Sequence, residues 1–395
     1  SWRSLRELYW REVERGVRPP AIGAEMKAVE VLTDPMPLII EGSTSAKARL
    51  LIRRSRSKEF RGTLLLRGRE VGVEPSRLEV ECRGSGVFEC EVEFQVAKLE
   101  PRAYSICYTL NSNCGVVRGS IPLIVLGTGG DVLVNHEDDT WIVDNGVLAF
   151  RVAAGFAGTL YSARLGEVEQ LESPYPKPGQ LVWINPWYGG VRVVSRVSRD
   201  SLWREEWKAE PVNVEEWRGV KVYTDVRDER NSWIKGLRIE QYYLTRPGSN
   251  VIALYTVLEN RSRRALEPEL FLTAFVKPGG VRAHSMAIRR GGGVEIWRNW
   301  GYDMPYMISR EQAAVYNDVA AASLVAGRSG VEVIAMSFGQ EGGCHLAVSV
   351  APDDLLRPGE KFGLSSYLVL TRKLEEALRY HPLTRLALQG PCSSL

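Results

Sequence analysis

Apolar and polar residues alternate along most of the first third of the chain. Runs in which every second residue is apolar are separated by Gly, Ser, Pro or Asn at intervals of roughly ten residues. These runs are "AKARLLIRR", "GTLLLRG", "RLEVEC", "FECEVEFQV" and "AYSICYTL". The pattern predicts a β-sandwich of immunoglobulin-like size over residues 28–127, followed by a glycine-rich linker, "GTGGD", at 127–131.

The alternation continues beyond this linker, without a convincing helix, to about residue 370. The predicted strands are "WIVDNGVLAFRV", "GTLYSARLG", "VRVVSRVS", "GVKVYTDV", "GLRIEQYYLT", "NVIALYTVLEN", "ELFLTAFV", "GVEVIAMSF" and "KFGLSSYLVLT". Only "TRKLEEALRYH" at 371–381 has helical spacing. Because no internal repeat divides this region, we expect one large antiparallel domain over 131–385, in an all-β chain with short helices at its two ends.

Residues 1–27 have a different pattern. "SLRELYWREVERG" at 4–16 carries a capping box formed by Ser4 and Glu7, and its apolar residues fall on one helical face. We expect a short docking helix and an extended linker. The chain begins at Ser1 and shows no signal-peptide pattern. This favours the hypothesis that a catalytic domain precedes Ser1 in a larger protein.

The charge balance excludes some partners. The formal net charge is +3 and charged residues make up 25% of the chain, so a nucleic-acid partner is not expected. The longest apolar run, "IPLIVLG" at 121–127, is far shorter than the roughly 18 residues that span a bilayer, so no membrane segment is expected. The arginine bias of the cationic residues is compatible with a GC-rich or thermophile source. The sequence does not indicate the cellular compartment of the protein.

Six cysteines leave two alternatives. Cys82, Cys90, Cys107 and Cys114 lie close together in the sequence and could form two disulfides, or they could be buried free thiols. No CxxC occurs, so zinc is not expected. Calcium is the one candidate ion, at the acidic segment "NHEDDT" at 135–140, although a solvated turn explains that segment better. No cofactor is expected.

Two stretches resemble galactose mutarotase-like β-supersandwich domains. They are "VDNGVLAFRVAAGFAGTLYSARLGEVEQL" at 143–171 and "GLRIEQYYLTRPGSNVIALYTVLENRSRRALEPELFLTAFVKPGG" at 236–280. The resemblance covers roughly 131–380 and implies a broad curved sheet whose concave face is the usual place for a carbohydrate. Such domains occur in sugar epimerases, glycoside hydrolases and polysaccharide lyases, and as non-catalytic modules. Mutarotases carry a general-acid histidine near the position of "LTAFVKPGG", where this chain has none; its nearest is His284.

Aromatic residues supply the candidate ligand-binding side chains. Eight of the eleven tryptophans lie between residues 183 and 300. An indole face matches the C–H face of a pyranose, so the cluster suits a sugar groove, although large sandwiches also use tryptophan as core filler. In "LVWINPWYGGVRV" at 181–193, we expect Trp183 to face inward, and Trp187 and Tyr188 to form a sugar-facing platform at a bend.

Carboxylates on predicted strands supply the candidate catalytic residues. In "LWREEWK", alternation would place Trp203, Glu205 and Trp207 on one face of a strand. A second candidate is the pair Asp225 and Glu240, if their two strands are neighbours with aligned polar faces. The alternative for both is an ion-paired surface. The polar face that carries Glu240 also carries the ligand-binding candidates Arg238 and Tyr242.

The segment "EIWRNWGYDMPY" at 295–306 has the composition of a loop. An exposed loop with many rings favours a binding lip, and the rival contact is a partner subunit. Its candidates are Trp297, Trp300 and Tyr302 for ligand binding, and Asp303 for catalysis.

Three hypotheses remain open from the sequence. The first is a carbohydrate-binding accessory region of a larger multidomain enzyme, either non-catalytic or substrate-recognising. The second is a complete carbohydrate-active enzyme, a glycoside hydrolase, lyase or epimerase, that uses paired carboxylates. The third is a cell-surface structural protein. The four histidines have no spacing suited to a metal or a catalytic triad, which favours the first.

Overall fold

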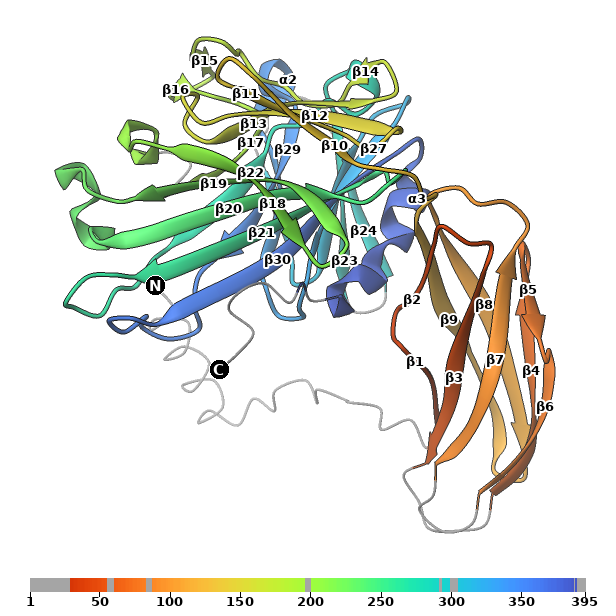
Figure 1. Cartoon of the computed structure of the whole chain (residues 1–395). Coiled ribbons are helices and arrows are strands. Elements are labelled where there is room, and N and C mark those ends of the chain that lie inside the picture. The colour runs from red at the N-terminus through yellow and green to blue at the C-terminus, as the bar shows by residue number, and fades with distance from the viewer. Residues whose placement is uncertain are drawn as a thin grey trace.

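The computed structural model describes residues 29–386 and 388, apart from 55–59, 83–86, 196–199, 291–292 and 299–304. The predicted helix at 4–16 lies outside the described residues. Most of the described chain is strand, which confirms the predicted all-β class. Figure 1 shows two bodies, a smaller one formed by β1 to β9 and a larger one formed by β10 to β30 and the helices α2 and α3.

The smaller body is a sandwich of two sheets. One has the order β1-β3-β7-β5 and the other the order β2-β9-β8-β4-β6. Their strands are β1 (Val29–Asp34), β2 (Leu38–Glu41), β3 (Ser45–Arg54), β4 (Phe60–Gly68), β5 (Val71–Glu74), β6 (Arg77–Cys82), β7 (Phe88–Val96), β8 (Arg102–Ser112) and β9 (Gly115–Gly127). The predicted alternation is clear in β7, where Val92, Phe94 and Val96 enter a core between the sheets. The immunoglobulin-like assignment of this sandwich stays a prediction.

The larger body contains two long sheets. The ten-stranded sheet has the order β10-β11-β12-β13-β17-β22-β29-β28-β25, with β14 beside β13. Its strands are β10 (Leu133–Glu137), β11 (Thr140–Asp144), β12 (Leu148–Ala153), β13 (Thr159–Leu165), β14 (Val168–Glu169), β17 (Val191–Val194), β22 (Leu270–Ala274), β25 (Tyr306–Ser309), β28 (Val333–Ser337) and β29 (Cys344–Val350).

The nine-stranded sheet has the order β18-β19-β20-β21-β30-β27-β26-β23-β24. Its strands are β18 (Lys208–Val214), β19 (Trp217–Asp225), β20 (Leu237–Thr245), β21 (Val251–Asn260), β23 (Ser285–Arg290), β24 (Gly293–Arg298), β26 (Gln312–Tyr316), β27 (Ala321–Ala326) and β30 (Lys361–Thr371). The strand pairs of both large sheets are antiparallel, as predicted. A separate hairpin is formed by β15 (Gly179–Leu181) and β16 (Ile184–Trp187).

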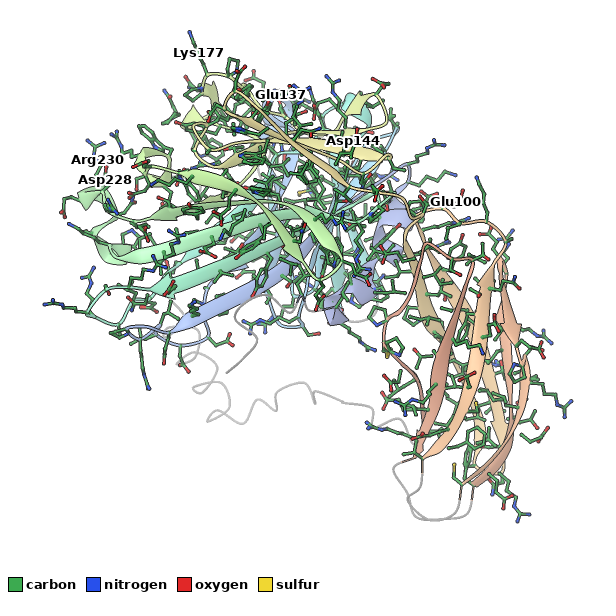
Figure 2. All side chains as sticks on the ribbon, in the orientation of Figure 1. Glu100, Glu137, Asp144, Lys177, Asp228 and Arg230 are labelled. Carbon is green, nitrogen blue, oxygen red and sulfur yellow. The ribbon has the colours of Figure 1, made fainter. Side chains whose placement is uncertain are left out.

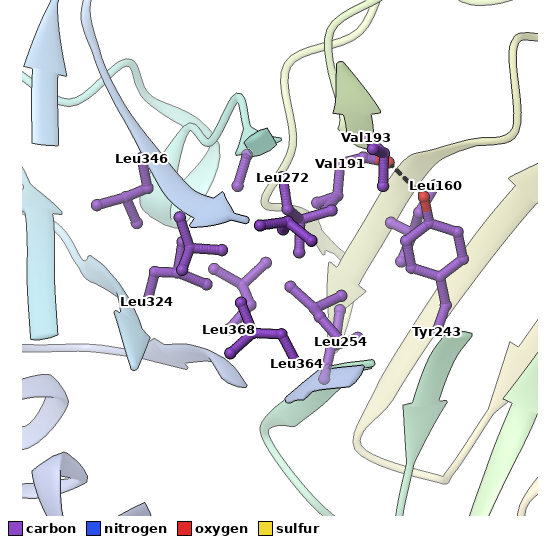
Figure 3. Packing of buried hydrophobic residues seen from close by; sticks show 14 of the residues in the cluster. Leu160, Val191, Val193, Tyr243, Leu254, Leu272, Leu324, Leu346, Leu364 and Leu368 are labelled. Atoms are coloured by element: carbon purple, nitrogen blue, oxygen red, sulfur yellow. Dashed lines mark hydrogen bonds between the residues drawn. The ribbon is translucent and has the colours of Figure 1, made fainter. Parts of the chain in front are cut away.

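A large apolar core fills the space between the two long sheets. Leu254 of the nine-stranded sheet and Leu272 of the ten-stranded sheet belong to it, as Figure 3 shows. One buried polar group crosses this core. The hydroxyl of Tyr243 on β20 lies 2.9 Å from the carbonyl oxygen of Val191 on β17 and 3.0 Å from that of Gly158. Because burial disfavours the phenolate, the pKa of Tyr243 is raised well above its usual value, and the group acts as a hydrogen-bond donor.

Part of the outer face of the nine-stranded sheet is covered. A second apolar cluster joins Tyr242, Tyr255 and Tyr367 of this sheet to Ile124 and Leu126 of β9 in the smaller sandwich. The C-terminal segment also contributes to the cluster, through residues that follow α3 (Leu374–Arg379), the helix predicted from "TRKLEEALRYH".

The two sandwiches also meet through a buried cation. Arg246 after β20 is ion-paired with Glu41 of the smaller sandwich and lies 3.2 Å from Glu216. Its guanidinium carbon is 5.0 Å from the ring centroid of Trp217. The predicted linker at 127–131 is irregular after Gly127, but the domains that it joins share an apolar interface.

The cysteines of the described residues are not paired. Cys82, Cys90, Cys107, Cys114 and Cys344 are free thiols, which decides against disulfides among the first four. Cys107 and Cys114 are exposed, so the expectation of burial is wrong for them.

In the described part of the chain, no helix is long and apolar enough to cross a membrane.

Candidate functional site

The outer face of the ten-stranded sheet carries polar and aromatic residues because its central strands alternate. On β17, Val191 and Val193 enter the core, and Arg192 between them points to the outer face. Arg192 pairs across the ladder with Thr273 on β22, whose neighbours Leu272 and Ala274 are core residues. The same alternation on the adjoining strands gives the outer face its buried hydrogen-bonding groups.

A small, shallow pocket, partly open to solvent, lies over this face. It adjoins the glycine pair Gly189 and Gly190, both of which have φ near +60°. A Cβ at Gly189 would meet the carbonyl oxygen of Glu172 at 2.2 Å, and one at Gly190 would meet that of Leu160 at 2.3 Å. Glycine is therefore required at both positions. The pocket is lined by Ile184, Pro186, Trp187, Tyr188, Gly189, Arg192, Val194, Asp200, Thr273 and Phe275.

Arg192 and Asp200 form the charged part of the pocket. The Arg192 Nη1 donates to Asp200 Oδ2 at 2.5 Å, and the Arg192 side chain is only 6% exposed. The Arg192 guanidinium carbon lies 5.0 Å from the ring centroid of Tyr188. Its Nε and Nη2 have no hydrogen-bond partner. The pocket thus contains buried N–H donors that the protein does not satisfy.

Trp187 adds a third donor of this kind. Its ring packs edge-on against Phe275, with 5.6 Å between the centroids, and its buried Nε1 has no hydrogen-bond partner. Because Trp187 and Arg192 both line the pocket, their free N–H groups belong to the same site.

A second polar group adjoins the pocket behind Phe275. Glu172 accepts a hydrogen bond from Arg282 Nε at 2.6 Å through Oε1, whereas its buried Oε2 has no partner. His345 on β29 lies 4.6 Å from Phe275, between ring centroids. Its Nε2 is 2.6 Å from the carbonyl oxygen of Gly342, which can only accept, so Nε2 carries the proton. The buried Nδ1 is then an acceptor without a partner.

These atoms are concentrated on one face. Among the described residues, eleven buried side-chain polar atoms have no hydrogen-bond partner, and five of them belong to Glu172, Trp187, Arg192 and His345. A buried polar group without a partner is costly, so the Trp187 and Arg192 donors that line the pocket need a hydrogen-bond acceptor from outside the protein, either water or a ligand.

The structure corrects the predicted orientation of Trp183. Trp183, expected to be core filler, is 51% exposed at the turn of the β15–β16 hairpin. Trp187 and Tyr188, expected to form a sugar-facing platform at a bend, are only 7% and 8% exposed and line the pocket, and their ligand-binding role stays a prediction. The β15–β16 hairpin packs against the ten-stranded sheet. Trp187 lies on the side of the hairpin that contacts the sheet, and Trp183 lies at its turn.

The prediction that residues 203–207 form a strand is wrong. Leu202–Arg204 is a short 3₁₀ helix, so Trp203, Glu205 and Trp207 do not share a strand face. Glu205 accepts hydrogen bonds from the backbone N–H groups of Arg227 and Asp228 and from the Asn231 side chain. It therefore holds the turn whose residues Asp228 and Arg230 are seen in Figure 2 at the end of the larger body remote from the smaller sandwich.

Trp203 and Trp207, expected on one strand face, lie in different surroundings. Trp207 is a core residue, and its Nε1 donates to the carbonyl oxygen of Leu202 at 3.0 Å. Its predicted ligand-binding role stays a prediction. Trp203 is half-buried beside Tyr188, at 6.5 Å between ring centroids, and so lies next to the pocket.

The predicted alignment of Asp225 and Glu240 is confirmed as a matter of register. β19 and β20 are neighbours, with Asp225 opposite Arg238 and Tyr223 opposite Glu240. Arg238 lies 3.2 Å from a carboxylate oxygen of each acid, and Glu240 also accepts a hydrogen bond from Tyr242. These residues are on the nine-stranded sheet and do not line the pocket. Their catalytic and ligand-binding roles stay predictions.

The predicted binding lip is only partly described. Gly293–Arg298 is the edge strand β24 rather than loop, and Trp297 packs half-buried against the main core. Trp300, Tyr302 and Asp303 lie outside the described residues.

The predicted ion site lies in a hairpin. Residues 135–140 run from β10 through a turn at Asp138 and Asp139 into β11. Within the described ranges, no group of three or more His, Cys, Asp or Glu side chains could hold a metal ion.

Sequence reasoning missed Arg192, Asp200, Glu172 and His345. The available signal was "VRVV", in which a single arginine interrupts an otherwise apolar strand. A charged residue at such a position points to a buried, paired group.

No protein-family model matches the chain, and no curated protein matches it. Among solved structures, a TPR-domain containing protein from Parabacteroides distasonis is 12% identical with a TM-score of 0.44, covering 90% of this chain and 58% of that chain. A galactose mutarotase-like protein from Clostridium acetobutylicum is 10% identical with a TM-score of 0.44, covering 62% and 99%.

A galactose mutarotase related enzyme from Lactobacillus acidophilus is 9% identical with a TM-score of 0.40, covering 62% of this chain and 100% of that chain. All these scores are too low to carry an argument about the chemistry of the pocket.

Proposed function

We propose that this chain binds a carbohydrate in the pocket over β17 and β22, as the substrate-recognising region of a larger carbohydrate-active enzyme. The observation that carries the proposal is the pairing of unsatisfied N–H donors with aromatic walls. Trp187 and Arg192 supply the donors, and Tyr188 and Phe275 supply the rings. A sugar presents hydroxyl oxygens and apolar C–H faces together, and it matches both features.

The charges of the site are paired internally, Arg192 with Asp200 and Arg282 with Glu172. Such a site is suited to hold a polar molecule by directed hydrogen bonds.

A recognition role is favoured over catalysis by the position of the acids. Asp200, the acid that lines the pocket, is held by Arg192 and by the backbone N–H groups of Ser195 and Leu202. Asp225 and Glu240 bind Arg238 on the other sheet. A general acid or base needs a carboxyl group within reach of the ligand, and these contacts argue against that use of Asp200, Asp225 and Glu240. Glu172 does not line the pocket and is held by Arg282.

The test compares two indole N–H groups. Trp187→Phe removes the unsatisfied donor of the pocket and retains an aromatic ring. Trp217→Phe removes an equally buried and unsatisfied N–H that lies at the interface between the sandwiches. We expect Trp187→Phe to weaken carbohydrate binding about fivefold, the value of one hydrogen bond, and Trp217→Phe to leave it unchanged.

Binding is measured by calorimetry with the sugar that gives the strongest signal on a glycan array. Thermal unfolding of both variants shows that each is folded. Absence of binding to every sugar on the array, or equal affinity in the two folded variants, contradicts the proposal.

A further inference from the structure

Two partly exposed indoles flank the pocket. Trp183, at the turn of the β15–β16 hairpin, is 51% exposed, and Trp203, in the 3₁₀ helix at 202–204, is half-buried. Tryptophan is the side chain with the largest apolar surface, and its exposure on a folded protein marks a contact surface when other rings surround it. The pocket walls Trp187 and Tyr188 lie between these two indoles in the sequence and in the chain of ring contacts.

The first end of this chain of contacts begins at Trp183. Its ring centroid is 5.2 Å from that of Phe338, which is 6.0 Å from Phe275. Phe275 in turn is 5.6 Å from Trp187. The inner three rings are buried, so the outer face of Trp183 is supported from below by a rigid apolar layer.

The second end leaves the pocket at Tyr188. Its ring is 6.5 Å from that of Trp203, and 4.8 Å from Phe156 in a further buried cluster. Arg204 lies over the Trp203 ring, with its guanidinium carbon 4.1 Å from the centroid. The stacked arginine covers one face of the indole, so a ligand can stack only on the other face, and it leaves a cation at the same edge of the surface.

The pocket itself is shallow and partly open to solvent. It can enclose one edge of a ligand but does not cover the ligand on all sides. Groups attached to the bound unit would extend over the protein surface toward the two indoles.

We infer that the ligand is an oligosaccharide chain, one unit of which enters the pocket while neighbouring units stack on Trp183 and Trp203. This inference rests on the proposed function, because it names the size of the carbohydrate that the same pocket would bind. The donors of Arg192 and Trp187 fix one unit, and the flanking indoles contribute apolar contact without selecting hydroxyl positions. The binding free energy should therefore increase with chain length until both indoles are covered.

The experiment measures affinity as a function of chain length. The probes are glucose with the cello- and malto-oligosaccharides up to the hexamer, galactose with galacto-oligosaccharides, and xylose with xylo-oligosaccharides. We expect the series that binds to tighten by at least about fivefold between the monosaccharide and the tetrasaccharide. Trp183→Ala and Trp203→Ala should each remove part of this gain and leave monosaccharide affinity unchanged.

The matched control is Trp233→Ala. Trp233 is 36% exposed and lies in the 3₁₀ helix Glu229–Ile234, a different part of the larger body. This variant should keep the full dependence on chain length. Thermal unfolding of the three variants, which change partly exposed positions, confirms that each is folded.

The outcomes separate this inference from the proposed function. If monosaccharide and tetrasaccharide bind equally well, or if both indole variants keep the full gain, the inference is overturned while the proposed pocket stands. If no probe and no array sugar binds, the proposed function fails as well. If only Trp233→Ala loses the increase in affinity with oligosaccharide length, the oligosaccharide binds at another part of the surface, and the inference is also overturned.

Discussion

His345 shows how one buried side chain can make this protein sensitive to acid. Burial lowers the pKa of His345 to about 3, helped by the positive charge of Arg282, although the hydrogen bond to Gly342 acts in the opposite direction. An unfolded histidine has a pKa near 6.5. The unfolded chain therefore binds a proton at pH values where the folded chain does not.

This difference predicts a loss of stability on acidification. The contribution of His345 is fully present above pH 6.5 and is lost as the pH falls from about 6.5 toward about 3, with a slope approaching about 1.4 kcal/mol per pH unit. His345→Gln should flatten the pH profile of the unfolding free energy between pH 6.5 and pH 4.5, measured by urea denaturation. The exposed His136→Gln variant serves as the control, and an identical slope in wild type and His345→Gln would refute the assignment.

The tryptophans of 181–193 show at the same scale why residue type alone does not assign a role. Trp183 and Trp187 are four positions apart and have the same chemistry, yet one is half-exposed and the other is buried. Their difference follows from the hairpin that places Trp187 between Phe275 and the pocket.

At the scale of elements, Tyr243 ties the two large sheets together. Its ring belongs to the core, and its hydroxyl reaches the backbone of β17 across the interface, as the dashed line in Figure 3 shows. A Phe side chain has almost the same volume but cannot donate to the buried carbonyl oxygen of Val191. The cost of removing the hydroxyl is therefore that of a buried acceptor losing its partner.

We expect Tyr243→Phe to lower the unfolding free energy by about 1–3 kcal/mol. Chemical denaturation measures this loss. Tyr306→Phe is the control, since Tyr306 on β25 is 67% exposed and its substitution should be neutral within about 0.5 kcal/mol. Equal stability of Tyr243→Phe and wild type would show that the hydrogen bond has no net effect.

The strand β9 explains the longest apolar run of the sequence. Alternate residues of "IPLIVLG" enter different cores: Leu123 and Val125 face the interior of the smaller sandwich, whereas Ile124 and Leu126 face the larger one. A strand covered on both sides needs apolar residues at successive positions, and its alternation disappears. The run is therefore a signature of the contact between the sandwiches.

At the scale of the whole molecule, the shared apolar cluster couples two bodies that each have a core of their own. Leu126 and Leu123 lie on the same strand and are both fully buried, but only Leu126 belongs to the shared cluster. Truncation of either side chain should cost about 2–5 kcal/mol, with different consequences for cooperativity.

We expect Leu126→Ala to split thermal unfolding, followed by calorimetry, into two transitions, because it weakens the contact and leaves both cores intact. Leu123→Ala should instead lower the transition of the smaller sandwich. If Leu126→Ala unfolds in one transition at a temperature close to that of wild type, the cluster does not couple the two bodies.

The sequence by itself determined the strands, because alternation of apolar and polar residues records which positions face a core. It therefore predicted the all-β class, the C-terminal helix and the shared polar face of Asp225, Arg238 and Glu240. Alternation also determines the orientation of Arg192, which lies between the core residues Val191 and Val193 and faces away from the core.

Only the tertiary structure decided which sheet face is covered and which is open. Periodicity shows that a strand has two faces, but the element that packs on each face comes from a distant part of the chain. The smaller sandwich covers part of the nine-stranded sheet, and the carboxylate pair lies on that sheet, away from the pocket on the other one. The turn contacts of Glu205 and the buried position of Trp187 likewise depend on residues far away in sequence or on how a hairpin folds back, which local pattern does not record.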